Sequence, residues 1–327
     1  MRAVLCKAFG PPESLVVESV VPPALRPGTA RVAVHAAGVN FADTLMIAGR
    51  YQERPPFPFT PGLEIAGEVL EVAADVTGLT PGARVLGTME AGGYADEAVL
   101  PAASLTLLPD AMDYVTAAGF PVAYGTSHGA LEWRARLRPG ETLLVHGAAG
   151  GVGLTAVEIG KAMGATVIAT AGSAEKLAIA KAHGADHLVD YAQESIRDRV
   201  RELTEGRGAD VVYDPVGGDA FDASLRAIAW EGRILVIGFA GGRVPQIPAN
   251  ILLVKNCDVI GFYWGSYRKR RPDALRRSYE QLLAWFTAGK LKPHVSERYD
   301  LAEVAEALRA LTTRRSTGKV VLTTGRS

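Results

Sequence analysis

The stretch Leu143-Leu144-Val145-His146-Gly147-Ala148-Ala149-Gly150-Gly151-Val152-Gly153 leads from a hydrophobic run into a glycine-rich run, and the mainly apolar Leu154-Thr155-Ala156-Val157-Glu158-Ile159 follows. Strand, glycine turn and helix in this order are typical of a dinucleotide-binding βαβ unit. Ala148 stands where the G-x-G-x-x-G pattern has its first glycine, whereas Gly150 and Gly153 match the other two. A glycine-rich turn without a ligand is the alternative, and the flanking strand and helix argue against it.

The two matching glycines have different expected roles. We expect Gly150 to let the backbone approach a pyrophosphate, and Gly153 to let the helix pack closely on the strand. The N–H groups at the start of the helix would bind the pyrophosphate, because the helix dipole favours negative charge there. These N–H groups belong to Ala149, Gly150, Gly151 and Val152.

The end of the next strand, 167–171, indicates which dinucleotide is bound. An NAD enzyme usually places Asp or Glu there for the ribose hydroxyls, but no acidic residue occurs from Gly164 to Ala174. Ser173 and Lys176 would accept a 2′-phosphate, which a carboxylate would repel. Glu175 is expected in the first turn of the next helix, with Ser173 as its N-cap. The pattern favours NADPH over NADH, although Lys176 is also compatible with a solvated helix lysine.

The rest of the chain divides into two patterns. From residue 142 onward strand-like segments alternate with helical ones, which predicts an α/β domain with a doubly wound parallel Rossmann sheet. The first 120 residues instead contain short strands separated by Pro and Gly turns, which predicts a compact antiparallel β-barrel. Helices are expected over 272–289 and 301–311, and a final strand over 319–322, which we expect to rejoin the first domain.

Composition places broad limits on the class of protein. The 327 residues suffice for two domains, and Lys plus Arg equals Asp plus Glu at 35 each, so no overall field favours nucleic acid or membranes. Cys6 and Cys257 are too few for a disulfide framework. We find no signal peptide and no apolar run of membrane-spanning length. We therefore expect a cytoplasmic protein that does not interact with membranes.

Several motifs together resemble one family. They are Ala37-Gly38-Val39-Asn40-Phe41-Ala42-Asp43, Pro61-Gly62-Leu63-Glu64-Ile65-Ala66-Gly67, the glycine turn, Val211-Val212-Tyr213-Asp214-Pro215-Val216-Gly217-Gly218 and Thr317-Gly318-Lys319-Val320-Val321-Leu322. Over nearly the whole chain the sequence resembles the zinc-independent quinone oxidoreductases, the ζ-crystallin-like group of the medium-chain dehydrogenase/reductase superfamily. The resemblance implies a GroES-like β-barrel domain over 1–121 and 265–327 and a Rossmann domain over 122–264. The cofactor would lie in the cleft outside the carboxyl ends of the parallel strands. The resemblance also implies a homodimer joined through an edge strand near 257–262.

The departures from the alcohol dehydrogenases of this superfamily concern the metal. Asn40 stands where those enzymes have a zinc-binding Cys, and Leu63 where they have a His. The six histidines have no Cys or His at ligand spacing, and we expect each in a strand, in a turn or on the surface. We expect no metal, and alcohol oxidation is then disfavoured because nothing stabilises an alkoxide. Hydride transfer to a conjugated acceptor, such as a quinone, an enone or an enoyl thioester, suits such a site.

The resemblance also implies roles for individual residues. Asn40 and Thr126 would contact the cofactor near its nicotinamide end, and Ser173, Lys176 and Tyr191 would surround the 2′-phosphate. The residues that would close over the remainder are Phe239, Phe262, Tyr263, Trp264 and Lys319. Core packing for Phe239 and Phe262, a strand-end aromatic at Tyr191 and a surface lysine at Lys319 are the alternatives.

An alternative activity is suggested by Tyr51. It aligns with the tyrosine that enoyl-thioester reductases of the superfamily use as a proton donor, so it is a candidate catalytic residue together with Asn40. A reductase of 2-enoyl-CoA, 2-enoyl-ACP or alkenal double bonds is therefore the second hypothesis. Quinone reductases also tend to have an aromatic residue at this position without an established acid.

Two further signals are set aside. Gly125-Thr126-Ser127-His128-Gly129 matches the G-x-S-x-G elbow of α/β-hydrolases, but a helix and not a strand is expected before it. The run Arg268-Lys269-Arg270-Arg271 lacks the interleaved aromatic residues of a nucleic-acid-binding platform. Some ζ-crystallins bind RNA, so an NADPH-binding protein that binds RNA with little turnover is the alternative from another class. Nucleic acid is not the expected partner.

Overall fold

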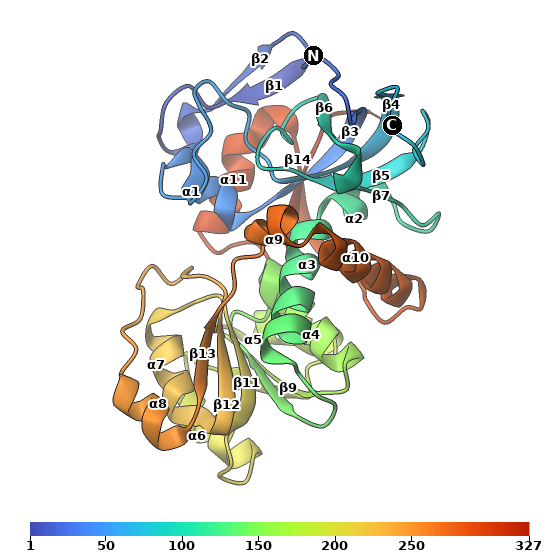
Figure 1. Ribbon diagram of the computed structural model, residues 1–327. Coiled ribbons are helices and arrows are strands. Elements are labelled where there is room, and N and C mark those ends of the chain that lie inside the picture. The colour runs from blue at the N-terminus through green and yellow to red at the C-terminus, as the bar shows by residue number, and fades with distance from the viewer. Residues whose placement is uncertain (327) are drawn as a thin grey trace. The chain divides into compact units, whose positions relative to one another are not determined.

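A computed structural model describes residues 1–326, and the chain forms two compact units (Figure 1). The first comprises Met1–Val122 together with the C-terminal segment from Pro293 on, and the second comprises Ala123–Lys292. The predicted fold class is confirmed: one unit has a parallel Rossmann sheet, and the other has the GroES-like fold. No helix among residues 1–326 has the length and apolar character needed to cross a membrane.

The second unit is built on a six-stranded parallel sheet of order β10-β9-β8-β11-β12-β13. The strands are β8 (Thr142–Val145), β9 (Thr166–Ala171), β10 (His187–Asp190), β11 (Ala209–Asp214), β12 (Ile228–Val236) and β13 (Asp258–Gly261). All four residues of β8 are buried, as expected for a central strand covered on both faces. The strand order reverses between β8 and β11, which is where doubly wound sheets bind ligands. β13 is an edge of the sheet, as predicted.

Helices of the second unit follow the predicted alternation with its strands (Figure 1). They are α3 (Pro121–Gly129), a π-helical segment (Ala130–Ala135), α4 (Gly151–Ala162), α5 (Ala174–Ala182), α6 (Ile196–Leu203), α7 (Gly218–Ala227), α8 (Ala249–Lys255), α9 (Gly265–Arg270) and α10 (Pro272–Thr287). Ser173 and Ser195 begin α5 and α6 by accepting hydrogen bonds from Lys176 and Asp198 backbone N–H groups. The helices α8 and α9 were not predicted.

The first unit contains a seven-stranded sheet and a separate two-stranded sheet. The larger sheet has the order β14-β15-β3-β4-β5-β7, with β6 also paired to β3. Its strands are β3 (Thr29–Val39), β4 (Glu64–Val72), β5 (Arg84–Thr88), β6 (Glu97–Pro101), β7 (Leu105–Leu107), β14 (Val295–Asp300) and β15 (Lys319–Thr323), while β1 (Arg2–Leu5) pairs with β2 (Val16–Ser19). The pairing over residues 1–326 leaves β14 and β7 as open ends. The GroES-like assignment of this unit is confirmed.

The long strand β3 pairs with different strands along its length, and its register shifts bend the sheet. Its first half, 29–33, pairs with β6, and its last residues, 36–39, pair with β15. The register with β4 shifts between Arg31 and Val32 and again between Val34 and Ala36. Such bulges bend a strand and increase its twist, so one strand can serve partners in two directions.

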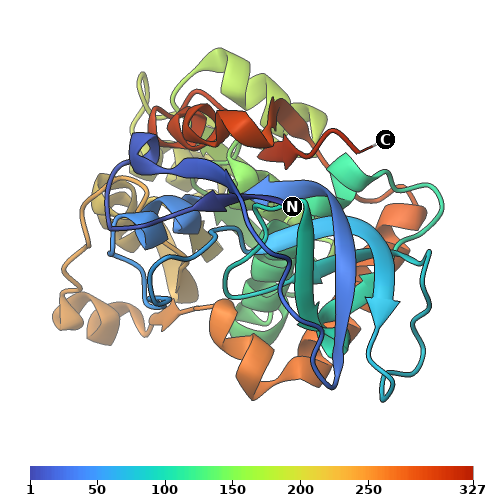
Figure 2. The ribbon, with the colours of Figure 1, turned by 90° about the horizontal axis from the view of Figure 1, so that it is seen from above.

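The C-terminal strand rejoins the first unit, as predicted. β15 pairs antiparallel with β3, with Leu322 opposite Ala37, and places β14 on its other side. The blue N-terminal and red C-terminal segments lie side by side in both views (Figures 1 and 2). Arg309 of α11 (Val304–Thr312) pairs with Glu13 at 2.8 Å. The short helices α1 (Phe41–Ile47) and α2 (Tyr114–Ala118) and the 3₁₀ turns Pro12–Ser14, Ala102–Ser104 and Leu301–Glu303 complete the unit.

One domain boundary differs from the expected one. Residues 265–292 belong to the second unit, whereas the sequence placed them in the first. The reason lies in α10, which buries Leu275, Tyr279 and Leu282. Ser278 on the same helix forms a buried 2.8 Å hydrogen bond with His128 of α3. These contacts fix α10 to the second unit.

Candidate functional site

The glycine turn lies at the carboxyl end of β8, where the strand order of the parallel sheet reverses. A Cβ added at Gly153 would lie 2.1 Å from the carbonyl oxygen of Gly147, so only glycine fits there. A Cβ added at Gly150 would meet nothing closer than that same oxygen at 3.3 Å. Internal packing therefore requires glycine at position 153, whereas a Cβ at position 150 would make a tight contact that needs a shift of a few tenths of an ångström.

The start of α4 presents backbone donors. Gly150 is its N-cap in an extended conformation, and no side chain caps the helix. The first N–H groups of a helix have no partner within the helix. The turn itself is held by hydrogen bonds from Gly150 N–H to the Gly147 carbonyl at 2.9 Å and from Ala148 N–H to the Thr170 carbonyl at 3.0 Å. This arrangement suits an anion bound at a helix N-terminus.

The end of β9 gathers three of the predicted phosphate-binding residues. Ser173 is the N-cap of α5, and its Oγ accepts a 3.4 Å hydrogen bond from the backbone N–H of Lys176. The half-exposed Tyr191 lies against Gly172, since a Cβ there would be 2.8 Å from the phenol oxygen. Glu175 occupies the first turn of α5, as expected. Ser173, Lys176 and Tyr191 thus belong to one small surface.

The first unit holds a buried polar network around Asn40 and Lys319. The Lys319 Nζ donates to the Val39 carbonyl at 2.9 Å, to Asn40 Oδ1 at 2.7 Å and to Glu64 Oε1 at 2.8 Å. Asn40 Nδ2 donates to the same Glu64 oxygen at 2.8 Å. The side chains of Lys319 and Glu64 are 8% and 0% exposed. The ammonium group, with three donors, therefore has its hydrogen bonds satisfied inside the protein.

A second buried carboxyl group, that of Asp43, adjoins this network. Its Oδ2 accepts hydrogen bonds from the Asn40 backbone N–H at 2.8 Å and from the Tyr94 hydroxyl at 2.7 Å. Its Oδ1 has no hydrogen-bond partner among the described residues. Burial raises the pKa of Asp43 to about 6, against the lowering effect of both hydrogen bonds and of Lys319. Burial, and next to it the Asp43 carboxylate, raises the pKa of Tyr94, so the phenol stays protonated and donates a hydrogen bond.

A zinc ion does not fit the residues at this place. Asn40 and the buried Leu63 stand at the positions where alcohol dehydrogenases of the superfamily have ligands. The Lys319 ammonium lies 2.7 Å from the Asn40 amide oxygen and would repel a dication. Nowhere in residues 1–326 do three His, Cys, Asp or Glu side chains converge in a geometry suited to a metal.

The remaining predicted residues lie in separate places. Thr126 is buried in α3, and the neighbouring Ser127 bonds the Val152 carbonyl at the start of α4 at 2.9 Å. Phe239 is partly exposed and lies beside Gly217. The aromatic residues Phe262 and Trp264 are both buried. Phe262 packs against Trp133 and Tyr267, and the Trp264 indole N–H has no partner among the described residues. Tyr51 packs half-buried on the core of the first unit.

Several buried polar residues were not predicted. His146 bonds Thr170 Oγ1 at 3.0 Å and Ser224 Oγ at 2.7 Å, and burial lowers its pKa. His128 lies buried within α3. The sequence had led us to expect it in a strand, in a turn or on the surface, so that expectation was wrong. Glu64 and Asp43 are preceded by apolar residues in their motifs, which is the signal that could have indicated buried carboxylates. No sequence pattern pairs them with Lys319, which is 255 residues from Glu64.

Comparisons with known proteins show similarity over both units. The alcohol dehydrogenase GroES-like domain matches residues 26–110, and the zinc-binding dehydrogenase domain matches residues 151–287. A quinone oxidoreductase-like protein 2 homolog of Nematostella vectensis is 47% identical, and the match covers 99% of this chain and 89% of the relative. The quinone oxidoreductase of Pseudomonas aeruginosa is 38% identical, with 96% and 97% covered. The crystal structure of Escherichia coli quinone oxidoreductase complexed with NADPH has a TM-score of 0.93 at 29% identity, with 99% and 100% covered.

The buried Asp43 predicts a defined pH dependence of stability. Its folded-state pKa of about 6 lies above the ordinary value of 3.8, so the folded protein retains a proton that the unfolded chain releases between about pH 4 and 6. The contribution of this carboxyl to stability is fully present below about pH 4 and is lost as the pH rises from about 4 through 6. Relative to Asp43→Asn, the free energy of unfolding of the wild type should fall by roughly 3 kcal/mol from pH 4 to 7. Urea denaturation of both proteins at each pH measures the free energy of unfolding.

The exposed Asp110→Asn serves as the control for this measurement. Its stability curve should run parallel to that of the wild type over the same range. Parallel curves for wild type and Asp43→Asn would show that the buried carboxyl does not titrate in this way.

Proposed function

The chain belongs to the quinone oxidoreductases of the medium-chain dehydrogenase/reductase superfamily, and we propose that it reduces quinones or related conjugated carbonyl acceptors with NADPH, by direct hydride transfer and without a metal. The observation that carries the proposal is the glycine turn at the switch point of the sheet. Glycine at 153 is required by packing, and Gly150 is an N-cap without a side chain, so no side chain competes with an anion for the N–H groups of the helix start. The complex of the Escherichia coli neighbour with NADPH supports the choice of cofactor.

In this proposal each group of residues has one task toward NADPH. The N–H groups of residues 149–152 bind the pyrophosphate, and Ser173, Lys176 and Tyr191 bind the 2′-phosphate. Thr126 and Phe239 contact the remainder of the cofactor. Bound there, NADPH would supply a hydride from its nicotinamide ring to the acceptor. The protein contributes binding and orientation of the two partners.

The structure leads us to change the roles of four residues that the sequence placed at the cofactor: Asn40, Lys319, Phe262 and Trp264. The Asn40 amide is engaged on both sides, by Lys319 and by Glu64, and all donors of Lys319 are used within the first unit. We therefore assign Lys319 the task of positioning Asn40, and Asn40 that of shaping the start of α1. Phe262 and Trp264 support the site through packing. The buried ammonium also accounts for the absence of a metal from the proposed reaction.

The selectivity for NADPH can be tested at the start of α5. Lys176→Ala should weaken NADPH binding about tenfold or more and leave NADH binding unchanged, because a charge-assisted hydrogen bond to the 2′-phosphate is lost. Ser173→Asp keeps an N-cap, since aspartate also caps helices, but it places a carboxylate beside the phosphate and should reverse the preference. Isothermal titration with both cofactors measures these affinities.

Lys181→Ala on the same helix is the matched control. Its Nζ donates to the Asp186 carbonyl and lies at the other end of α5, so the NADPH affinity should not change. If the wild type bound NADH as tightly as NADPH, and Lys176→Ala made no difference, the 2′-phosphate assignment would be wrong.

The acceptor class is tested by NADPH oxidation against 1,2- and 1,4-quinones, alkenals and crotonyl-CoA. We expect quinone turnover, and we expect it to survive Tyr51→Phe, because a reduced quinone takes its protons from water. The alternative, an enoyl-thioester or alkenal reductase with Tyr51 as proton donor, requires the hydroxyl. Turnover of crotonyl-CoA alone, abolished by Tyr51→Phe, would replace the quinone proposal with that alternative.

We further propose a cytoplasmic homodimer joined through the β13 edge. The free thiols of Cys6 and Cys257 favour a reducing compartment. Beside β13 in the sheet lies β12, on which Trp230 is 66% exposed, and in α8 Leu253 and Val254 are 78% and 77% exposed. An unpaired edge next to exposed apolar side chains suits a second copy of the chain.

Light scattering after gel filtration tests this assembly. The wild type should be a dimer, and Leu253→Glu with Val254→Glu should give a monomer, because two charges would be buried in the interface. Leu107→Glu, at an exposed position of the first unit, should leave the dimer intact. A monomeric wild type would contradict the proposal.

A further inference from the structure

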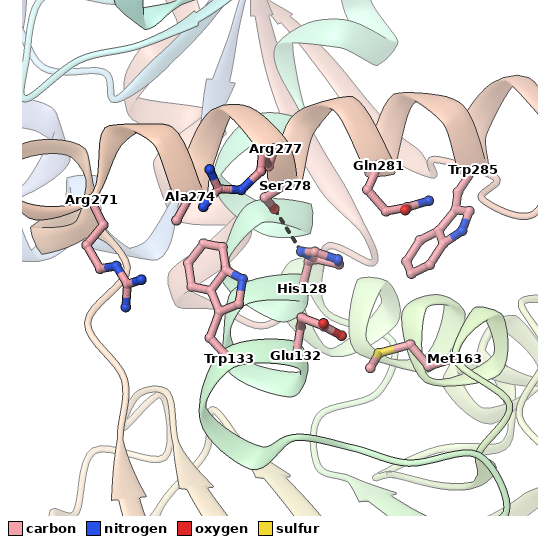
Figure 3. A pocket seen from close by; sticks show the side chains of 10 residues that line it. All are labelled: His128, Glu132, Trp133, Met163, Arg271, Ala274, Arg277, Ser278, Gln281 and Trp285. Atoms are coloured by element: carbon pink, nitrogen blue, oxygen red, sulfur yellow. Dashed lines mark hydrogen bonds between the residues drawn. The ribbon is translucent and has the colours of Figure 1, made fainter.

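The second unit contains a cavity of about 380 Å³ that includes none of the residues assigned to NADPH. It lies between the end of α3, the π-helical segment and α10 (Figure 3). Along α10 the residues Ala274, Ser278, Gln281 and Trp285 recur at helical spacing and line one wall. Cavities of 300–1,000 Å³ are typical of small-molecule sites. The size is therefore that of a site for a small ligand.

The opposite wall is formed by the π-helical segment Ala130–Ala135, which supplies Glu132 and Trp133. Such segments are rare and occur frequently at functional sites. The Trp133 ring packs directly on the backbone: a Cβ at Gly129 would lie 2.7 Å from it. Glycine at 129 and the π turn together give Trp133 its place in the cavity wall.

Two tryptophans stand on either side of one histidine in this cavity. The His128 ring meets Trp133 at 6.3 Å and Trp285 at 5.6 Å, edge to face in both pairs. Ser278 Oγ fixes the ring through Nδ1 at 2.8 Å, the bond drawn in Figure 3. Burial lowers the pKa of His128 to about 4, so the imidazole is neutral at pH 7. It offers a hydrogen bond and an aromatic surface without a charge.

The charge of the cavity comes from two arginines and one glutamate. Arg271 and Arg277 line it, and neither guanidinium has a carboxylate partner in residues 1–326. Their neighbour Arg276 is outside the lining and does pair, with Glu280 at 2.7 Å. Figure 3 shows both cavity arginines toward the Trp133 end, while Gln281 and Trp285 line the other end. Glu132 contributes the single opposing charge.

We propose that this cavity is a second ligand site, which binds a small planar aromatic carboxylate. The indole faces of Trp133 and Trp285 would pack on the aromatic ring. The guanidinium groups of Arg271 and Arg277 would bind the carboxylate, since the planar fork of arginine matches that group. Gln281 and His128 would supply neutral hydrogen bonds. This site is independent of the proposed NADPH site, and its ligand need not be the acceptor.

The test uses 2-naphthoate and its neutral isostere 2-naphthamide. Both are titrated into the full-length protein without NADPH or acceptor, and binding is measured by calorimetry and by tryptophan fluorescence. We expect the carboxylate to bind about tenfold or more tighter than the amide, because charge-assisted hydrogen bonds are formed only with the former. Arg271→Gln with Arg277→Gln should abolish this preference and leave the affinity for the amide unchanged. Glu132→Gln should strengthen carboxylate binding several-fold.

Arg276→Gln is the matched control, one residue away on α10, and should retain the full preference. Equal affinity for carboxylate and amide would overturn the proposal, and so would an effect of Arg276→Gln as large as that of the double variant. Competitive displacement of naphthoate by NADPH or by a neutral quinone would also overturn it, because the cavity would then belong to the reductase site. Turnover is not needed for any of these readouts, so a failed reductase assay leaves the result interpretable.

Discussion

The buried ion pair between Lys319 and Glu64, 2.8 Å apart, organises the first unit. Burying two charges costs several kcal/mol per ion unless each is paired and hydrogen-bonded. Here the ammonium group has three acceptors, and the carboxylate also receives hydrogen bonds from Asn40 and, at 2.7 Å, from the Val122 backbone. The pair joins β15 at the end of the chain to β4. It also fixes the end of β3, from which α1 begins.

The same ion pair decides what chemistry this place can support. A zinc enzyme keeps a positive charge here in the form of a metal with an open coordination position. In this chain the positive charge is an ammonium whose donors are all used, so it stabilises structure and leaves no site for a substrate oxygen. Asp43 beside it keeps one oxygen without a hydrogen bond, and its raised pKa follows from that burial. The hydride transfer that we propose therefore relies on an acceptor that delocalises its own charge.

The parts of the fold that could be predicted are those governed by local pattern. Alternating strands and helices of the second unit, its edge strand near Cys257 and the N-cap at Ser173 all follow from short-range sequence signals. The sequence placed the boundary at residue 264 instead of 292, because the contact between Ser278 and His128 that holds α10 in the second unit joins residues 150 positions apart. The open sheet of the first unit depends on register shifts in β3, which no composition or turn signal discloses. The Lys319 network was missed because it joins residues that are far apart in the sequence, such as Lys319 and Glu64.

The candidate site also has a part that the sequence displays and a part that only the tertiary structure shows. In the proposed site the phosphates are bound by backbone N–H groups, so the site appears in the sequence as glycine spacing, and packing alone accounts for the glycine at 153. The choice between NADPH and NADH depends on few side chains at one strand end, which a sequence also displays. Recognition of a small molecule by side chains instead requires a cavity whose walls come from distant segments, as Trp133 and Trp285 do in the proposed second site beside His128. Oxidoreductase class and cofactor are thus encoded locally, whereas specificity is a property of tertiary packing.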